Sequence, residues 1–102
     1  MITFPYEIDA SLNNMFEKSP MARELFCSAA GSSVRDEDAV RIICATIRLL
    51  PDDGHRFVNC GRILTALVGT DSEFFARLQK LVDTEMSWFK NRFLDPKEHL
   101  AA

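Results

Sequence analysis

The stretch that most constrains the fold is residues 36–50, with the sequence DEDAVRIICATIRLL. At 100° per residue, its apolar side chains cover most of the circumference of a helix and leave one narrow polar line. That line consists of Glu37, Arg41 and Arg48. A helix that is apolar on nearly every side has to be buried. We therefore predict that residues 36–50 form the central helix of an all-α domain.

Start and stop signals along the chain predict a compact bundle of about five helices. Ser19-Pro20 is a typical helix start, and Pro51 ends the central helix because proline cannot continue the hydrogen-bond ladder. The predicted helices span approximately residues 10–18, 20–30, 36–50, 55–68 and 71–94. The short link after the central helix predicts that it lies antiparallel to the helix of residues 55–68.

Local patterns give further expectations about caps and core faces. We expect Asp9 to cap the first helix, the pattern Ser33-x-x-Asp36 to cap the central one and a Thr70-x-x-Glu73 capping box to open the last. Glycine is expected to end two helices, at Gly31 and Gly69. Periodicity places Met21 and Phe57 on buried faces, and Gly61 where two helices approach closely.

The two ends of the chain lack a clear helical pattern. Residues 1–8 alternate apolar and polar side chains around Pro5, which predicts an extended arm lying on the helices. No second strand is visible to pair with this arm, residues 32–35 are predicted to form a turn, and no sheet is expected. Residues 95–102 are predicted to form a tail or a short helical turn. We predict one domain, residues 1–102.

Composition narrows the class of protein. The 102 residues carry a net charge of −3, which gives none of the basic character expected of a protein whose main partner is nucleic acid. The three cysteines form no C-x-x-C pair and are expected to fill the core in a reducing compartment. The start of the chain does not resemble a signal peptide, and no segment is apolar for long enough to span a membrane. We predict a soluble, cytoplasmic protein with no membrane partner.

Residues suited to catalysis are scarce. Nucleophilic catalysis needs a base held against a nucleophile by a third group, and the spacing of the two histidines indicates no such set. Asp52, Asp53 and His55 contain metal-ligating atoms within one turn, but acidic residues before a helix are more typical of a cap. We predict no catalytic residues, no metal, no cofactor and no enzymatic activity.

The most suggestive surface lies on the last long helix. Phe74, Leu81 and Trp88 recur every seven residues beside the core stripe, with Glu85 and Arg92 interleaved. The two stripes together are wider than a simple surface helix requires, and an aromatic residue near an arginine is typical of binding hot spots. Either the helix is wedged between its neighbours, with Arg92 extended over Trp88, or part of this face binds a partner.

The polar line of the central helix is a second candidate surface. Glu37 and Arg41 have the spacing of an i,i+4 ion pair, and Arg48 lies two turns along the same face. This line is either the one edge of the helix that reaches solvent or a charged groove for an acidic partner.

These observations favour a non-enzymatic helical module for protein–protein interaction. Such a module acts as an adaptor, an inhibitor, an assembly chaperone or a regulatory subunit, and binds a protein partner or a second copy of itself as a homodimer. The alternative is a helix-turn-helix DNA-binding regulator, in which one solvent-facing side of the helix of residues 55–68 presents His55, Asn59 and Arg62 to base edges. The acidic pI, about 5.3, counts against it.

Overall fold

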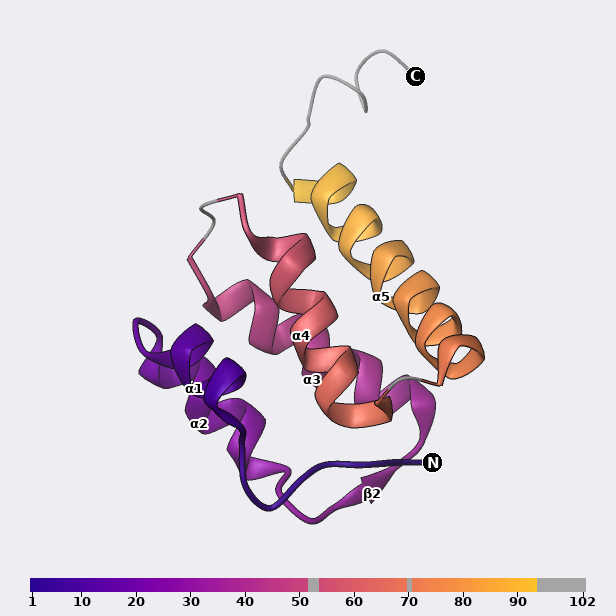
Figure 1. The fold of residues 1–102 in the computed structure, drawn as a ribbon. Helices are drawn as coiled ribbons and strands as arrows, with labels where there is room; N and C mark the ends of the chain where they lie inside the picture. Colours follow the sequence, from indigo (N-terminus) through magenta and orange to yellow (C-terminus); the bar gives the residue numbers. More distant parts are fainter. Residues whose placement is uncertain (52–53, 70, 94–102) are drawn as a thin grey trace.

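The computed structural model describes residues 1–51, 54–69 and 71–93, and within the last helix it describes the side chains through Met86 except that of residue 72. These residues form five helices and one two-stranded sheet, so the predicted all-α bundle is confirmed (Figure 1). The helices are α1 (Ala10–Phe16), α2 (Pro20–Ser28), α3 (Asp36–Leu49), α4 (Arg56–Val68) and α5 (Ser72–Phe93), and the strands are β1 (Ile2–Thr3) and β2 (Ser33–Val34).

Helix α3 is the centre of the bundle, as the sequence predicts. It packs against α2, α4 and α5, and its side chains Ile43, Cys44 and Ile47 are fully enclosed. Thr46 is also fully buried, and its hydroxyl donates a hydrogen bond of 2.8 Å to the carbonyl of Ile42 in the same helix. Every polar atom buried in a core needs a partner, and this hydroxyl finds one without leaving its own helix.

The caps follow the sequence signals in part. The Asp9 side chain accepts a hydrogen bond of 2.8 Å from the Leu12 amide, as expected, and Leu50 adopts the extended backbone that a following proline favours. The expected side-chain cap of α3 is wrong, because Arg35 occupies the N-cap position and makes no capping bond. In α5 the Asp71 carboxylate accepts from the Phe74 amide at 3.1 Å, while Thr70 of the predicted capping box lies outside the described residues.

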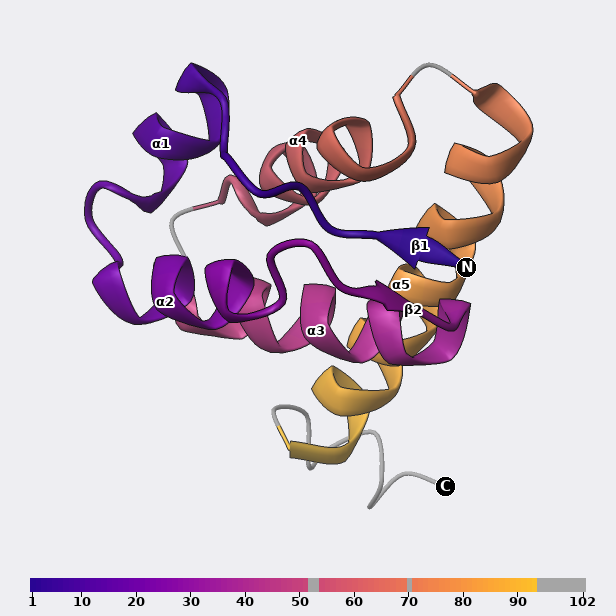
Figure 2. The same ribbon diagram turned by 90° about the horizontal axis from the view of Figure 1, so that it is seen from below.

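The N-terminal segment is extended and lies on the helices, but the expectation of no sheet is wrong. β1 pairs with β2 in antiparallel register, Ile2 opposite Val34 and Thr3 opposite Ser33 (Figure 2). Two further backbone hydrogen bonds of 2.9 Å continue the pairing from Phe4, one to the carbonyl of Ser32 and one from the amide of Gly31. The segment predicted as a turn at residues 32–35 thus supplies the partner strand.

An aromatic cluster anchors this arm in the core. The rings of Phe4 and Phe26 meet edge to face with their centroids 5.4 Å apart, and Phe16 lies 5.6 Å from Phe26 on the other side. All three side chains are buried, so the N-terminal segment, α1 and α2 share one apolar centre. Aromatic pairs in this geometry contribute beyond the area that they bury.

Three expectations about buried faces are wrong. Met21 is exposed on α2, and Phe57 is 73% exposed on α4. A Cβ atom at Gly61 would meet nothing within 4 Å, so no helix approaches this glycine closely. The stripe of α4 that faces the core instead comprises Cys60, Ile63 and Leu64, together with the polar residue Asn59.

The last nine residues lie outside the part of the chain that the structure describes, so the prediction for residues 95–102 has no counterpart here. Among the described helices, none combines the length and the apolar character needed to cross a bilayer.

Candidate interaction groove

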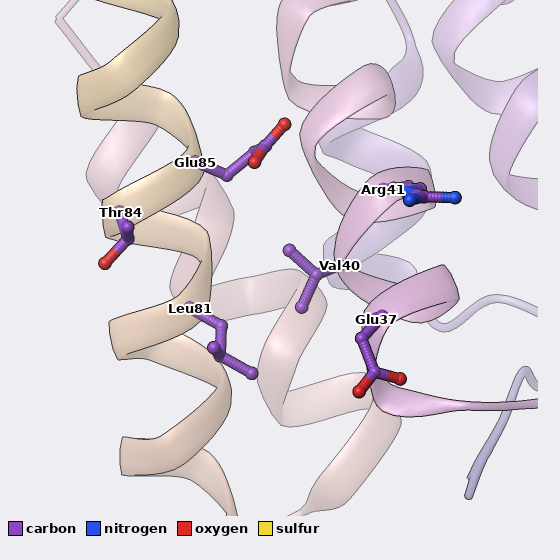
Figure 3. Close-up of a pocket in the computed structure, with 6 residues that line it drawn as sticks. All are labelled: Glu37, Val40, Arg41, Leu81, Thr84 and Glu85. Carbon is purple, nitrogen blue, oxygen red and sulfur yellow. The ribbon is translucent and has the colours of Figure 1, made fainter.

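Four residues of the two surfaces predicted from the sequence, Glu37, Arg41, Leu81 and Glu85, line a single groove between α3 and α5. Its volume is about 250 Å³. Val40 on α3 and Leu81 on α5 point into the space between the helices, and Glu85 extends from α5 toward α3 (Figure 3). The residues that line the groove are Glu37, Val40, Arg41, Leu81, Thr84 and Glu85.

Leu81 is the apolar centre of this groove and is 40% exposed. Leu78, one turn before it on α5, and Val82, the residue directly after it, are both buried against the rest of the core. α5 therefore uses one stripe to hold the bundle together and leaves Leu81 beside it with apolar surface in contact with solvent.

Phe74, at the start of the same predicted face, is engaged within the molecule. Its ring is half-buried against the core, and the guanidinium of Arg77 lies 4.5 Å from the ring centroid. Arg77 also forms an ion pair with Asp36 at the start of α3, with Nη2 and Oδ2 2.6 Å apart. These contacts tie the first turns of α3 and α5 together, so Phe74 contributes to the frame of the groove and does not line it.

The charges on α3 are arranged differently from the sequence expectation. Arg41 pairs with Asp38 at 3.8 Å and not with Glu37, and Arg35 pairs with the same Asp38 at 3.3 Å. Glu37 is exposed, and its carboxylate forms no ion pair with any residue that the structure describes. One wall of the groove therefore carries an unneutralised carboxylate beside its apolar centre.

Arg48 lies outside the groove, although it belongs to the same predicted polar line. Its charge affects the pKa of the Cys44 thiol, which lies one turn earlier on α3. Burial raises the pKa of the Cys44 thiol to about 11, while the positive charge of Arg48 lowers this pKa and the carboxylate of Glu85 raises it. Arg48 is half-buried, and both Arg48 and Glu85 act on the Cys44 thiol.

Trp88 and Arg92, the other two residues of the predicted α5 surface, lie on backbone that is part of α5. Their side chains lie outside the described part of the chain. The prediction that they belong to the interaction surface therefore stays a prediction.

The residues of the DNA-binding alternative line a different groove, between α1 and α4. His55, Asn59 and Arg62 lie along it together with Lys18 from the segment after α1. The expectation that all three face solvent is wrong for Asn59, which is buried. A buried amide is not presented to base edges in the major groove, where the contacting side chains have to project from the helix.

Sequence reasoning missed several side chains that belong to these grooves. Val40 and Thr84 line the α3–α5 groove, and Lys18 lines the α1–α4 groove. The apolar pattern of residues 36–50 assigned Val40 to the core, and no signal in the sequence shows which faces of α3 and α5 meet.

Among the described residues, no group of three or more histidine, cysteine, aspartate or glutamate side chains is placed to hold a metal ion. The α3–α5 groove combines an apolar centre with one neutralised arginine and two carboxylates. Comparison with known protein families, with curated protein sequences and with solved structures found no match to this chain.

Proposed function

We propose that this chain is a non-enzymatic helical module that binds a protein partner through the groove between α3 and α5. The single observation that carries the proposal is the convergence of Leu81 and Val40 with Glu37 and Glu85 on that groove. In this role the module serves as an adaptor, an inhibitor, an assembly chaperone or a regulatory subunit.

The chemistry of the groove defines the partner surface that fits it. An amphipathic helix of the partner places an aliphatic or aromatic side chain on Leu81 and a lysine or arginine toward Glu37 and Glu85. Binding at such sites depends on a few buried apolar anchors, while charges at the rim select the partner. A second copy of this chain is one such partner, which makes a homodimer part of the proposal.

A cytoplasmic location belongs to the same proposal. It is supported by the three cysteines, which form no disulfide in the structure and two of which are buried. Thiols that stay reduced are typical of proteins in a reducing compartment.

The test is a matched pair of charge insertions on equally exposed leucines. Leu81 in the groove and Leu49 at the end of α3 are both 40% exposed, and only Leu81 lines the groove. Because the two substitutions remove similar apolar surface, Leu81→Asp and Leu49→Asp should have similar effects on folding. Circular dichroism and thermal unfolding check this directly.

Sedimentation velocity at micromolar concentrations and quantitative cross-linking in the native cell then measure association. We expect Leu81→Asp to reduce the affinity of the homodimer, or the yield of the cross-linked complex, by at least about tenfold, because a charge buried at an interface without a partner strongly weakens binding. Leu49→Asp should leave both quantities unchanged. Equal association of the two folded variants would contradict the proposal.

A second pair of variants tests the charges of the groove. Glu37→Lys places a positive charge opposite the basic residue expected on the partner, while Glu24→Lys makes the same change at an exposed site on α2. We expect only Glu37→Lys to slow association, and the difference to shrink as salt is added, because exposed charges are screened. Identical association rates for the two variants would contradict the proposal that the partner has a basic residue facing Glu37.

A further inference from the structure

The second groove, between α1 and α4, has a different character. Its volume is about 290 Å³, close to the lower end of the range for small-molecule pockets in proteins. Met15 and Val58 give it apolar walls, and the polar side chains Asn14, Lys18, Asn59 and Arg62 line the rest with His55.

Among the residues that the structure describes, the charged side chains of this groove are basic. Lys18 comes from the segment after α1 and Arg62 from α4, and no aspartate or glutamate occurs among the described residues that line the groove. The whole chain carries a net charge of −3. A concave surface whose described charged side chains are all basic therefore differs locally from the charge of the molecule. A lysine and an arginine held on either side of a groove favour an anion with oxygen acceptors.

Asn59 provides an independent observation. Asn59 is only 8% exposed, and its side-chain amide makes no hydrogen bond with any residue that the structure describes. Because Asn59 lines the groove, its remaining accessible surface opens there. The polar atoms of this amide are not among the fully enclosed ones that lack a partner, so they reach solvent at the groove. The fold has therefore placed a hydrogen-bonding group where an occupant of the groove can bond it in place of water.

The start of α4 adds to the positive potential at one end of the groove. His55 is the N-cap residue of this 13-residue helix and makes no capping hydrogen bond with its side chain, and the first turn contains no acidic residue. The first amide groups of a helix lack partners within the helix and carry the positive end of its dipole. Anions bind readily in such surroundings.

We propose that the α1–α4 groove binds a small ligand that carries an oxyanion group, a phosphate or a carboxylate, on an apolar body. Lys18 and Arg62 neutralise the anion, the Asn59 amide donates to one of its oxygens, and Met15 and Val58 contact the apolar part. This site is separate from the α3–α5 groove, so it goes beyond the proposed function, and its test does not depend on that function.

The experiment is a titration of the full chain followed by nuclear magnetic resonance, with phenyl phosphate, phenylacetate and neutral benzyl alcohol as probes. The readout is the side-chain amide signal of Asn59. We expect saturable shifts of this signal with phenyl phosphate, with phenylacetate or with both, and none with benzyl alcohol. The anion that binds more tightly shows whether the groove prefers a phosphate or a carboxylate group.

Variants then assign the binding to the groove. We expect Lys18→Ala and Arg62→Ala each to lower the affinity for the anion about tenfold, because each removes a charge-assisted hydrogen bond. Arg23→Ala, on the exposed side of α2, is the matched control and should leave the affinity unchanged.

Asn59→Leu separates binding from folding. It replaces a largely buried amide that makes no hydrogen bond within the protein by an apolar side chain of similar size. The unliganded protein should therefore unfold at an equal or higher temperature, while the anion binds more weakly. Loss of folding in Asn59→Leu would show that the amide has a partner in the unliganded protein and would overturn its assigned role.

Three results would overturn the proposal as a whole. They are the absence of a saturable shift with either anion, equal shifts with benzyl alcohol, and equal affinities of Lys18→Ala, Arg62→Ala and Arg23→Ala for the anion. Binding of a duplex DNA that depends on Lys18 and Arg62, without binding of either small anion, would likewise replace the small ligand by nucleic acid.

Discussion

Cys44 and Cys60 are the residues whose chemistry the fold changes most. Burial raises the pKa of Cys44 to about 11 and that of Cys60 to about 12, and for Cys60 the negative charge of Asp83 adds to the effect. Cys27, in contrast, is exposed on α2, so the expectation that all three cysteines fill the core is wrong for this residue. Because the thiolate is the reactive form, a raised pKa leaves almost none of it at neutral pH.

We therefore expect a thiol-specific disulfide reagent at pH 8 to label one cysteine of the native protein and three of the urea-unfolded chain. The measurement is the absorbance of the released thiol over time. In Cys27→Ser, native labelling should fall to zero while two thiols still react in urea. Fast labelling of that native variant would mean that the core around α3 and α4 opens readily.

The pKa shifts of these thiols also predict how stability changes at high pH. Thiols of the unfolded chain ionise near their ordinary pKa of 9.0, whereas folded Cys60 ionises near 12. The unfolded state therefore loses protons first, and the free energy of unfolding should decline as pH rises above about 9. Urea unfolding at pH 8 and pH 10, under reducing conditions, should show a smaller decline for Cys60→Ala than for the natural chain, and an equal decline would contradict the shift.

At the scale of the element, α4 carries an avoidable weakness. Gly61 lies inside this helix with open space where a Cβ atom would be, so neither packing nor a positive φ requires glycine there. Glycine inside a helix is less favourable than alanine because it loses more backbone freedom on folding.

Gly61→Ala should therefore stabilise the protein by about 0.5–1 kcal/mol. For a domain of this size that corresponds to a rise in Tm of roughly 2–8 °C, measurable by circular dichroism. Gly69→Ala is the control with the opposite sign, because Gly69 ends α4 with a φ of 64° that a Cβ atom disfavours. A lower Tm for Gly61→Ala would show a close approach to this helix that the structure does not contain.

The elements themselves were predictable because their signals are local. Asp9 and Pro20 act within one turn of the helices that they start, and Pro51 acts on the residue directly before it. The pairing of β1 with β2 was not predictable, because each strand has two residues and the partners lie about thirty positions apart.

The faces of the helices were harder to predict than their bounds. Periodicity showed that α4 has an apolar side, but Phe57 lies at an edge of that side which no neighbour covers. The candidate groove could not be predicted for the same reason, because it depends on which helix faces meet. Both contributing surfaces were visible in the sequence, around Glu37 and around Leu81, but only the packing of α3 against α5 brings them together.

At the scale of the whole molecule, the N-terminal arm is part of the core. Phe4 is almost fully buried against Phe26, and its backbone continues the pairing that begins at Ile2. The first residues of a chain are often poorly ordered unless something holds them, and here both a strand partner and a ring contact do so.

Phe4→Ala should destabilise the protein by about 3–5 kcal/mol, the usual cost of removing a buried phenylalanine. Tyr6→Ala, two residues later in the same arm, removes a side chain that is 84% exposed and should change stability by less than about 1 kcal/mol. Urea unfolding monitored by circular dichroism compares the two. Similar stabilities would mean that the arm contributes little to the global unfolding transition.

The hydroxyl of Thr46 has a consequence for how the bundle is aligned. Because it bonds to the carbonyl of Ile42 in its own helix, it exerts no directional pull on α2, α4 or α5. The rotation and sliding of α3 among its neighbours are set at this position by steric fit alone. A rotation or a slide of α3 as a whole would therefore leave the hydrogen bond of Thr46 intact.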